Sequence, residues 1–149
     1  MLTSTDASIF EINPKKIVYP KDRNDLISVI RNILSDKKPF TMRAGGTSIG
    51  GQAIGSGVLV DVSKHLNNII DFFEDRKEII VEPGVIQDDL NLFLQSYNLK
   101  FAPDTSTSNR AMIGGMIGNN SCGSYSIFYG TTRDHVKSIE VILSDGSLV

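Results

Sequence analysis

The chain has 149 residues, of which 40% are hydrophobic and 21% charged, the ordinary range for a globular domain that buries a core. Its formal net charge of -2 and the lack of any run of lysine or arginine exclude generic binding to nucleic acid or to anionic membranes. No stretch is apolar enough for a spanning helix, and the N-terminus lacks the order of a signal peptide. We therefore expect a cytoplasmic protein, with peripheral association with the inner membrane left open.

The first part of the sequence predicts a βαβ-like unit. Residues 16–19 are rich in β-branched and aromatic side chains, and a helix is expected to begin around Asp22. Its apolar residues recur at helical spacing: Leu26, Ile27, Val29, Ile30, Ile33 and Leu34. Pro39 ends this helix before a strand at residues 40–43, and a helical connection predicts that the two strands are parallel.

The middle of the chain predicts strands and two short helices. In order, these are a strand at 58–62, a hairpin of 69–73 and 78–82, a helix at 87–97, a polar loop at 103–110 and a helix within 112–120. A weak boundary at Ser56-Gly57 divides the chain into a lobe of residues 1–57 and a strand-rich lobe of residues 58–149. The expected fold class is α+β with two α/β lobes.

The last residues predict a strand at 136–143 followed by a hairpin turn at Asp145-Gly146. The return strand would comprise residues 147–149, which is too short to complete its pairing. We expect a C-terminally truncated domain, with a short natural edge strand as the alternative.

Ten of the thirteen glycines fall in two windows, at residues 45–57 and 114–123. The first window follows a strand, and its bare amides and hydroxyl groups suit a phosphate. A flexible linker between lobes is the alternative. Neither a Gly-x-Gly-x-x-Gly opening a helix nor a Gly-Lys-Ser/Thr occurs, so Rossmann and P-loop readings are excluded. The second window predicts a small-residue helix face, which suits either a flat ligand or close helix packing.

Other reactive residue types have ordinary explanations. Cys122 is the single cysteine and, without a nearby histidine, is predicted to be a small buried residue rather than a nucleophile. His135 is read as a strand-entry residue. With His65 distant in sequence, no metal centre is expected.

The order of several motifs resembles the FAD-binding domain of the vanillyl-alcohol oxidase and p-cresol methylhydroxylase family. These motifs are Arg43 to Ser48, Pro103-Asp104, Ile113 to Gly123, Tyr129-Gly130 and Ile139 to Gly146. The run from Asn109 to Ser121 is similar to the D-lactate and D-2-hydroxyglutarate dehydrogenase branch, which includes long bacterial proteins fused to an iron–sulfur region. The resemblance covers residues 16–149.

The resemblance implies a set of FAD-binding residues. Around the pyrophosphate it places Arg43, Ala44, Gly45, Gly46, Thr47, Ser48, Ile49 and Gln52. Along the ribityl and isoalloxazine side it places Pro103, Asp104, Thr105, Ser108, Gly114, Gly115, Gly118, Asn119, Asn120 and Gly123. Residues 43–57 contain no histidine or cysteine that could tether the flavin, so non-covalent FAD is expected.

The implied function is that of a flavoprotein oxidoreductase, an FAD-linked dehydrogenase that oxidises a 2-hydroxy acid by hydride transfer to FAD. The family's substrate cap and catalytic positions lie downstream, so no catalytic residue is assigned and the electron acceptor is not specified. Two alternatives are a non-catalytic nucleotide- or polyphosphate-binding module and a UDP-sugar flavin reductase of the same fold. Bound flavin separates the module from the two enzymes.

Overall fold

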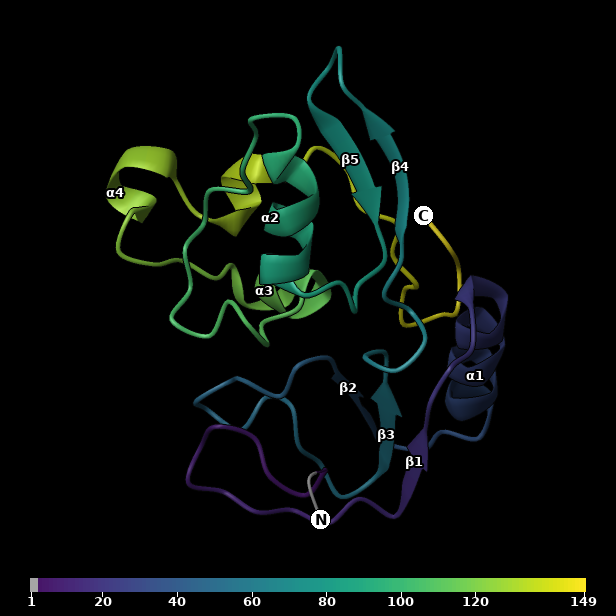
Figure 1. Cartoon of the computed structure of the whole chain (residues 1–149). Coiled ribbons are helices and arrows are strands. Elements are labelled where there is room, and N and C mark those ends of the chain that lie inside the picture. The colour runs from purple at the N-terminus through teal and green to yellow at the C-terminus, as the bar shows by residue number, and fades with distance from the viewer. Residues whose placement is uncertain (1–2) are drawn as a thin grey trace.

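The computed structural model describes residues 3–149, which form two packed parts (Figure 1). The first contains β1 (Lys16–Val18), α1 (Arg23–Ser35), β2 (Phe40–Arg43) and β3 (Val58–Asp61). The second contains β4 (Ile69–Phe73), β5 (Glu78–Val81), α2 (Gln87–Gln95), α3 (Ile113–Asn119), α4 (Ser126–Tyr129) and the 3-10 helix η1 (Thr132–His135). The predicted mixture of strands and helices is confirmed.

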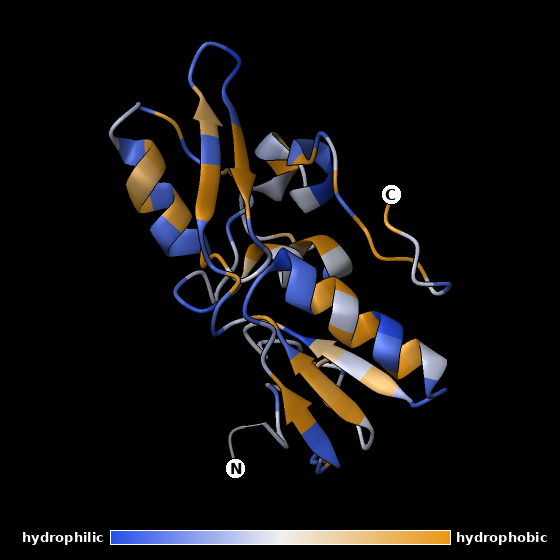
Figure 2. Cartoon of the chain, turned by 90° about the vertical axis from the view of Figure 1, so that its right-hand side faces the viewer, coloured by the Kyte–Doolittle hydropathy of each residue, from blue (hydrophilic) through white to orange (hydrophobic). Residues whose placement is uncertain are grey.

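The first part is a three-stranded parallel sheet with strand order β1-β3-β2. Every residue of the central strand β3 is buried, as expected for a strand flanked on both edges and covered on its faces. Helix α1 lies against the sheet (Figure 2), where Ile30 and Ile33 pack on Val58 and Val60. The connection from β2 to β3 is the first glycine window.

Two details of this sheet correct the sequence expectations. The strands β1 and β2 are parallel as predicted, but β3 lies between them, so they do not pair with each other. The boundary expected at residue 57 therefore falls inside the first sheet, because β3 completes that sheet rather than opening the second part. Local sequence gave no sign of this pairing, since strand order depends on contacts between distant segments.

Helix α1 begins and ends at local signals that the sequence carries. The side chain of Asp22 accepts a hydrogen bond from the Asp25 amide at 2.8 Å, which caps the first turn. At the other end Lys37 adopts a positive φ of 52°, and Pro39 follows before β2. The helix thus has the length that returns the chain to the sheet.

The second part has its own apolar core beneath the β4–β5 hairpin. Leu90 and Leu94 of α2 pack with Ile113 and Met116 of α3. Phe72 on β4 contacts the rings of Phe93 and Tyr97, with centroids 5.6 and 4.4 Å away. This core fixes α3, and with it the second glycine window.

The segment at 136–143 is not the strand that was predicted. It forms one isolated bridge, Ile142 with Leu148, because the return segment offers partners to Val141 and Leu143 alone. The turn prediction is confirmed: Gly146 has a φ of 81° and its amide donates to Leu143 at 2.9 Å. The hairpin packs on α1, where Arg31 donates to the Gly146 carbonyl at 3.0 Å. Helices α4 and η1 are too short for periodicity to predict.

Candidate functional site: two glycine windows in contact

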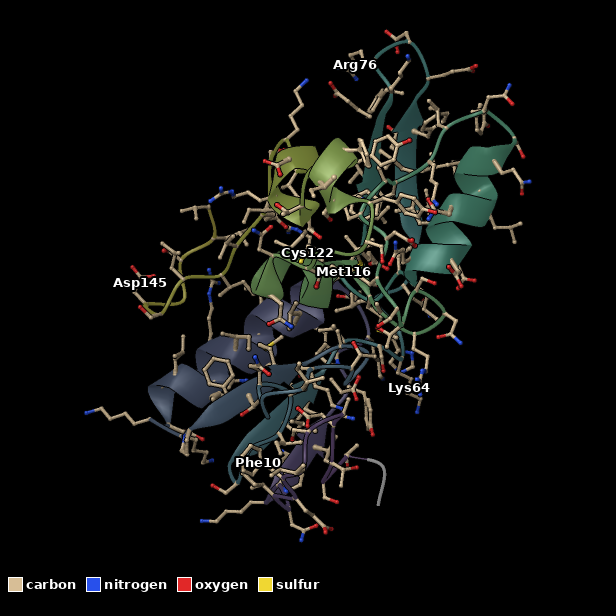
Figure 3. All side chains as sticks on the ribbon, turned by 90° about the vertical axis from the view of Figure 1, so that its left-hand side faces the viewer. Phe10, Lys64, Arg76, Met116, Cys122 and Asp145 are labelled. Carbon is tan, nitrogen blue, oxygen red and sulfur yellow. The ribbon has the colours of Figure 1, made fainter. Side chains whose placement is uncertain are left out.

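The two glycine windows meet at the junction between the two parts of the chain. The backbone of Gly45 lies so close to the carbonyl of Arg110 that a β-carbon at residue 45 would overlap that oxygen. A β-carbon built on Gly115 would lie 3.6 Å from the methyl group of Ala44. Figure 3 labels Met116 and Cys122, both within the second window, at the level where the two parts join. The windows therefore form one continuous surface. Cys122 is exposed, so the prediction that it is buried is wrong.

The side chain of Arg43, at the end of β2, supports the first glycine window from within the fold. Its Nη1 donates to the carbonyls of Thr5 at 2.9 Å and Ala53 at 3.0 Å, and its Nε lies 4.0 Å from the carboxylate of Asp61. The side chain is only 10% exposed. Asp61 is paired with it across β2 and β3 and also accepts the Ser63 hydroxyl at 2.5 Å. The Arg43 guanidinium is therefore bonded to the protein itself and stabilises the loop.

Immediately after Arg43 and Ala44, the loop carries a row of three successive backbone amides, those of residues 45–47. Within residues 3–149, the amides of Gly45, Gly46 and Thr47 donate to no backbone or side-chain acceptor. Gly46 has a φ of 62°, and a β-carbon there would overlap the Arg43 guanidinium. Successive amides around a left-handed residue form a concave anion-binding nest. The Thr47 hydroxyl likewise has no partner among the described residues.

The rest of the first window is held by its neighbours. The Ser48 hydroxyl donates to Asp6 at 3.1 Å, and Gln52 accepts the Gly50 amide at 3.1 Å. Ile49 is 84% exposed. Of the window residues, Ser48 and Gln52 thus shape the loop through hydrogen bonds, whereas Ile49 projects into solvent.

The polar loop at 103–110 is organised by Gln87, a residue that sequence reasoning missed. Gln87 is 1% exposed, its amide nitrogen donates to the Pro103 carbonyl and its oxygen accepts the Thr105 hydroxyl at 2.7 Å. The Ser108 carbonyl accepts the Asp88 amide at 3.2 Å. A lone polar residue opening a helix carries no sequence signal of burial, so Gln87 could not be identified beforehand.

Two further glycines of the second window are explained by packing. A β-carbon at Gly123 would overlap the backbone of Asp104, and one at Gly114 would lie 2.5 Å from the Pro83 ring. The amides of Ile113 and Gly114 donate to Val85 and Pro83 carbonyls at 2.9 and 2.8 Å. These two amides at the start of α3 are therefore already satisfied and do not face a ligand unpaired.

The far end of α3 is open. A β-carbon at Gly118 would meet nothing within 4 Å, and Gly118 and Asn119 are exposed. Asn120 takes a left-handed conformation with φ of 47° and its side-chain oxygen accepts the Arg133 amide at 2.9 Å. Asn120 therefore ends α3 and holds η1, while Gly118 leaves a bare backbone surface.

Arg110 is a second residue that sequence reasoning did not select. It is exposed, its carbonyl packs on Gly45, and its side chain has no partner among residues 3–149. Arg110, whose backbone contacts the first window, thus carries a positive charge that no described residue pairs with. Arg43 was selected from the sequence because it lies in the glycine motif, but its guanidinium is already bonded to other residues of the protein.

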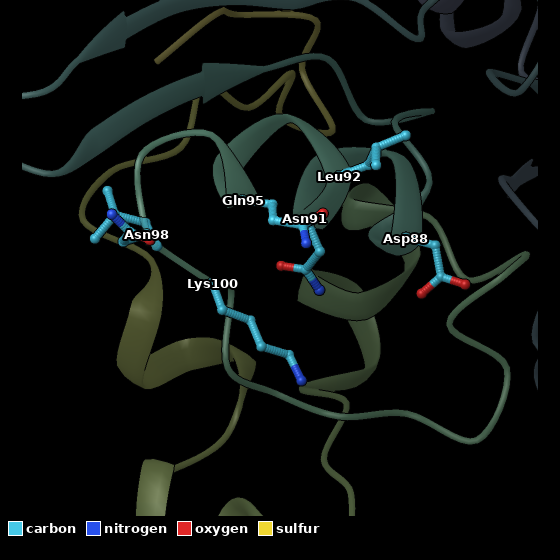
Figure 4. A pocket seen from close by; sticks show the side chains of 7 residues that line it. Asp88, Asn91, Leu92, Gln95, Asn98 and Lys100 are labelled. Carbon is cyan, nitrogen blue, oxygen red and sulfur yellow. The ribbon is translucent and has the colours of Figure 1, made fainter.

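Two surface hollows lie away from the glycine windows. One of about 470 Å³ lies between α2 and residues 98–100 (Figure 4), and another of about 400 Å³ lies between α1 and the C-terminal hairpin. Neither is lined by a residue of the glycine windows. Residues 3–149 contain no group of three or more His, Cys, Asp or Glu side chains placed for a metal ion. In the same range, every helix is too short or too polar to span a bilayer.

Comparison with known protein families identifies the kind of domain that carries this surface. The model of a family described as "FAD binding domain" matches residues 14–149. The chain belongs to this family. The FAD-binding domain covers both glycine windows and both parts of the fold, which confirms FAD as the cofactor class that the motif order implied.

Curated relatives of this FAD-binding domain are much longer proteins. It is 40% identical over 149 residues to D-2-hydroxyglutarate dehydrogenase of Escherichia coli, a match covering 98% of this chain and 15% of that protein. It is 30% identical to mitochondrial D-lactate dehydrogenase [cytochrome] 1 of Saccharomyces cerevisiae, covering 93% of this chain and 24% of the relative. The chain spans about 15% of the length of the D-2-hydroxyglutarate dehydrogenases that it matches.

A solved structure supports the same fold. Alkyldihydroxyacetonephosphate synthase superposes on this FAD-binding domain with a TM-score of 0.80 at 18% identity, over 89% of this chain and 25% of the synthase chain. At that identity the likeness speaks for the fold alone. It confirms the expected p-cresol methylhydroxylase type of FAD-binding fold.

Proposed function

We propose that the amides of Gly45, Gly46 and Thr47 hold the pyrophosphate of a non-covalently bound FAD. These three donors lack partners among the described residues, and the positive φ of Gly46 gives the loop its concave shape. The open amide row is the observation that supports this most directly. Arg43 supports the loop from within, and Arg110 supplies the exposed positive charge that compensates the phosphates.

The flavin side of the cofactor is assigned to the second window and the polar loop. Gly118 offers a bare face that a flat ring system can approach, and Asn119 is an exposed carboxamide beside it. Pro103, Asp104, Thr105 and Ser108 line the neighbouring loop that Gln87 holds in place. Gly114 and Gly123 keep the windows at this separation through close packing, and Asn120 does so by holding η1. Gly115 makes only an ordinary contact with Ala44.

The reaction is proposed for the longer polypeptide that the relatives imply. Their names point to oxidation of a D-2-hydroxy acid of the 2-hydroxyglutarate or lactate type. When bound, FAD supplies the hydride acceptor, and the residues of this chain bind and orient it. We place the part that binds the acid outside this chain, in agreement with the family resemblance.

Two experiments test these assignments. Titration of the purified chain into FAD should quench flavin fluorescence, and acid denaturation should release all of the flavin into the supernatant. Flavin that stays with the precipitate contradicts the non-covalent assignment. The longer polypeptide, mixed anaerobically with D-2-hydroxyglutarate or D-lactate, should lose the visible absorption of its oxidised flavin. Failure of both acids, with D-malate and glycolate also inert, rejects the substrate class.

A further inference from the structure

The residues that precede β1 form a clip over the first glycine window. Within this clip, residues 4–12, Thr5 and Glu11 form an antiparallel bridge and the Ile12 amide donates to the Ser4 carbonyl at 2.8 Å. Ser4 is 1% exposed. The clip is therefore a closed turn with a fixed shape, although it belongs to no helix or sheet of the fold.

The clip is attached to the glycine window at three points besides Asp6. The Ala7 amide donates to the Ser48 carbonyl at 3.1 Å, and Arg43 donates to the Thr5 carbonyl at 2.9 Å. A β-carbon on Gly51 would lie 3.1 Å from the ring of Phe10, which Figure 3 labels in the first part of the chain. Main-chain and side-chain contacts thus hold the loop at Ser48 and Gly51 and at Arg43, where it begins.

The carboxylate of Asp6 joins the two ends of the 48–53 turn. One oxygen accepts the Ser48 hydroxyl at 3.1 Å and the Ala53 amide at 3.4 Å, and the other accepts the Ser8 amide at 2.9 Å. Burial alone raises the pKa of Asp6, but hydrogen bonds from Ser8, Ala53 and Ser48 outweigh it and hold the pKa below its ordinary value. Asp6 is therefore ionised at neutral pH, the form in which it accepts all of these bonds.

We propose that Asp6 is a positioning residue for the dinucleotide: by fixing Ser48 and Ala53 it holds the loop in the shape that presents the amides of residues 45–47. This inference rests on the proposed pyrophosphate role of those amides. The family match begins at residue 14, so the clip lies outside the matched region and yet shapes the site. Asp6 itself touches no cofactor atom in this scheme, since its carboxylate is engaged with the loop.

The test compares Asp6→Ala, Asp6→Asn and a matched control, Asp145→Ala. Asp145 makes the same local contacts, accepting the amide of Ser147 at 2.8 Å and its hydroxyl at 2.6 Å, but in the hairpin against α1. ADP and FAD affinities of the purified chain are measured by calorimetry, and amide hydrogen exchange is followed by mass spectrometry. ADP carries the pyrophosphate without the flavin, so it reports on the amide row directly.

Asp6→Ala should weaken ADP and FAD by a similar factor, about tenfold, and speed exchange in residues 45–53. Asp6→Asn keeps an acceptor oxygen for Ser48, so it should restore most of the affinity. Asp145→Ala should leave both affinities unchanged. A general rise in exchange across the chain, with no rescue by Asp6→Asn, would show a merely structural role and overturn the proposal.

The two proposals fail in different ways. If the unaltered chain binds neither ADP nor FAD, the pyrophosphate role of the amide row is rejected and the role of Asp6 with it. If the unaltered chain binds both ligands and Asp6→Ala binds them equally well, the role of Asp6 alone is rejected.

Discussion

The α-carbon of Gly45 lies against the carbonyl oxygen of Arg110, with no room for a side chain between them. This contact joins the connection between β2 and β3 to the segment that leads into the second glycine window. It sets the separation of the two windows, and several measurable consequences depend on it.

Replacing Gly45 with alanine should separate the windows. The added methyl group meets backbone rather than a flexible side chain, so the loop must shift, at a cost of about 1–3 kcal/mol in unfolding free energy. FAD affinity should fall as well, which fluorescence quenching measures. Gly115→Ala is the control, because its methyl group would lie 3.6 Å from Ala44, an ordinary contact.

Gly118→Ala should have opposite effects on the stability of the fold and on FAD binding. The position is exposed within α3 and has no neighbour within 4 Å, so alanine should raise the unfolding free energy by up to about 1 kcal/mol. If the flavin lies on this surface, FAD affinity should fall while ADP affinity stays the same. Thermal unfolding and parallel titrations measure both effects. Unchanged FAD affinity would remove Gly118 from the flavin-binding surface.

Gln87→Ala should destabilise the polar loop. Removing this buried side chain leaves the Pro103 carbonyl and the Thr105 hydroxyl without their partner, which costs about 1–3 kcal/mol in unfolding free energy. Urea denaturation measures the loss. Gln95→Ala, on the exposed side of the same helix, should change stability by less than about 0.5 kcal/mol.

Arg110→Gln should weaken FAD and ADP binding and make it less sensitive to salt. An exposed cation beside a pyrophosphate acts through a screened attraction, so its removal flattens the dependence of affinity on ionic strength. Titrations at low and high sodium chloride measure this slope. Arg76→Gln, at the tip of the β4–β5 hairpin (Figure 3), should leave the slope unchanged.

Stability should fall in acid. A hydrogen bond from Lys137 holds the pKa of Glu78 below its ordinary value of 4.5, and one from Arg23 does the same for Glu140. A depressed folded-state pKa stabilises the fold above the unfolded pKa, and that contribution is lost as the pH falls through the folded value. Urea midpoints should be level above about pH 5.5 and decline below about pH 4.5. Glu140→Gln should make the decline shallower.

The sequence predicted local structure well and long-range pairing poorly. Helix α1 was foreseen because a cap, an apolar stripe and a proline lie within one segment. The position of β3 between β1 and β2 was not, since residues 16–18 and 58–61 are joined by tertiary contacts alone. Residues 136–143 have the composition of a strand, but they contact β5 and α1 through the side chains of Lys137 and Glu140 rather than through a sheet ladder.

For the site, the glycine windows were predictable and their supports were not. Clustered glycines are visible in any sequence, and the contact of Gly45 with Arg110 gives that clustering a physical cause. Gln87 and Asp6 were missed because an isolated polar residue reveals neither its burial nor its distant partners. Arg43 was placed at the phosphates by its motif, whereas the structure gives its guanidinium to Thr5, Ala53 and Asp61.

The central position of β3 has a consequence for synthesis on the ribosome. When residues up to 57 have emerged, β1 and β2 are both present, but neither has a neighbour with which to pair. The sheet can form only after Val58–Asp61 leaves the exit tunnel, and forming it requires the 44–57 segment to bend back along the nascent chain. Sheet assembly and closure of the glycine loop are thus one event, and a ligand held by that loop would slow the release of β3 from its neighbours.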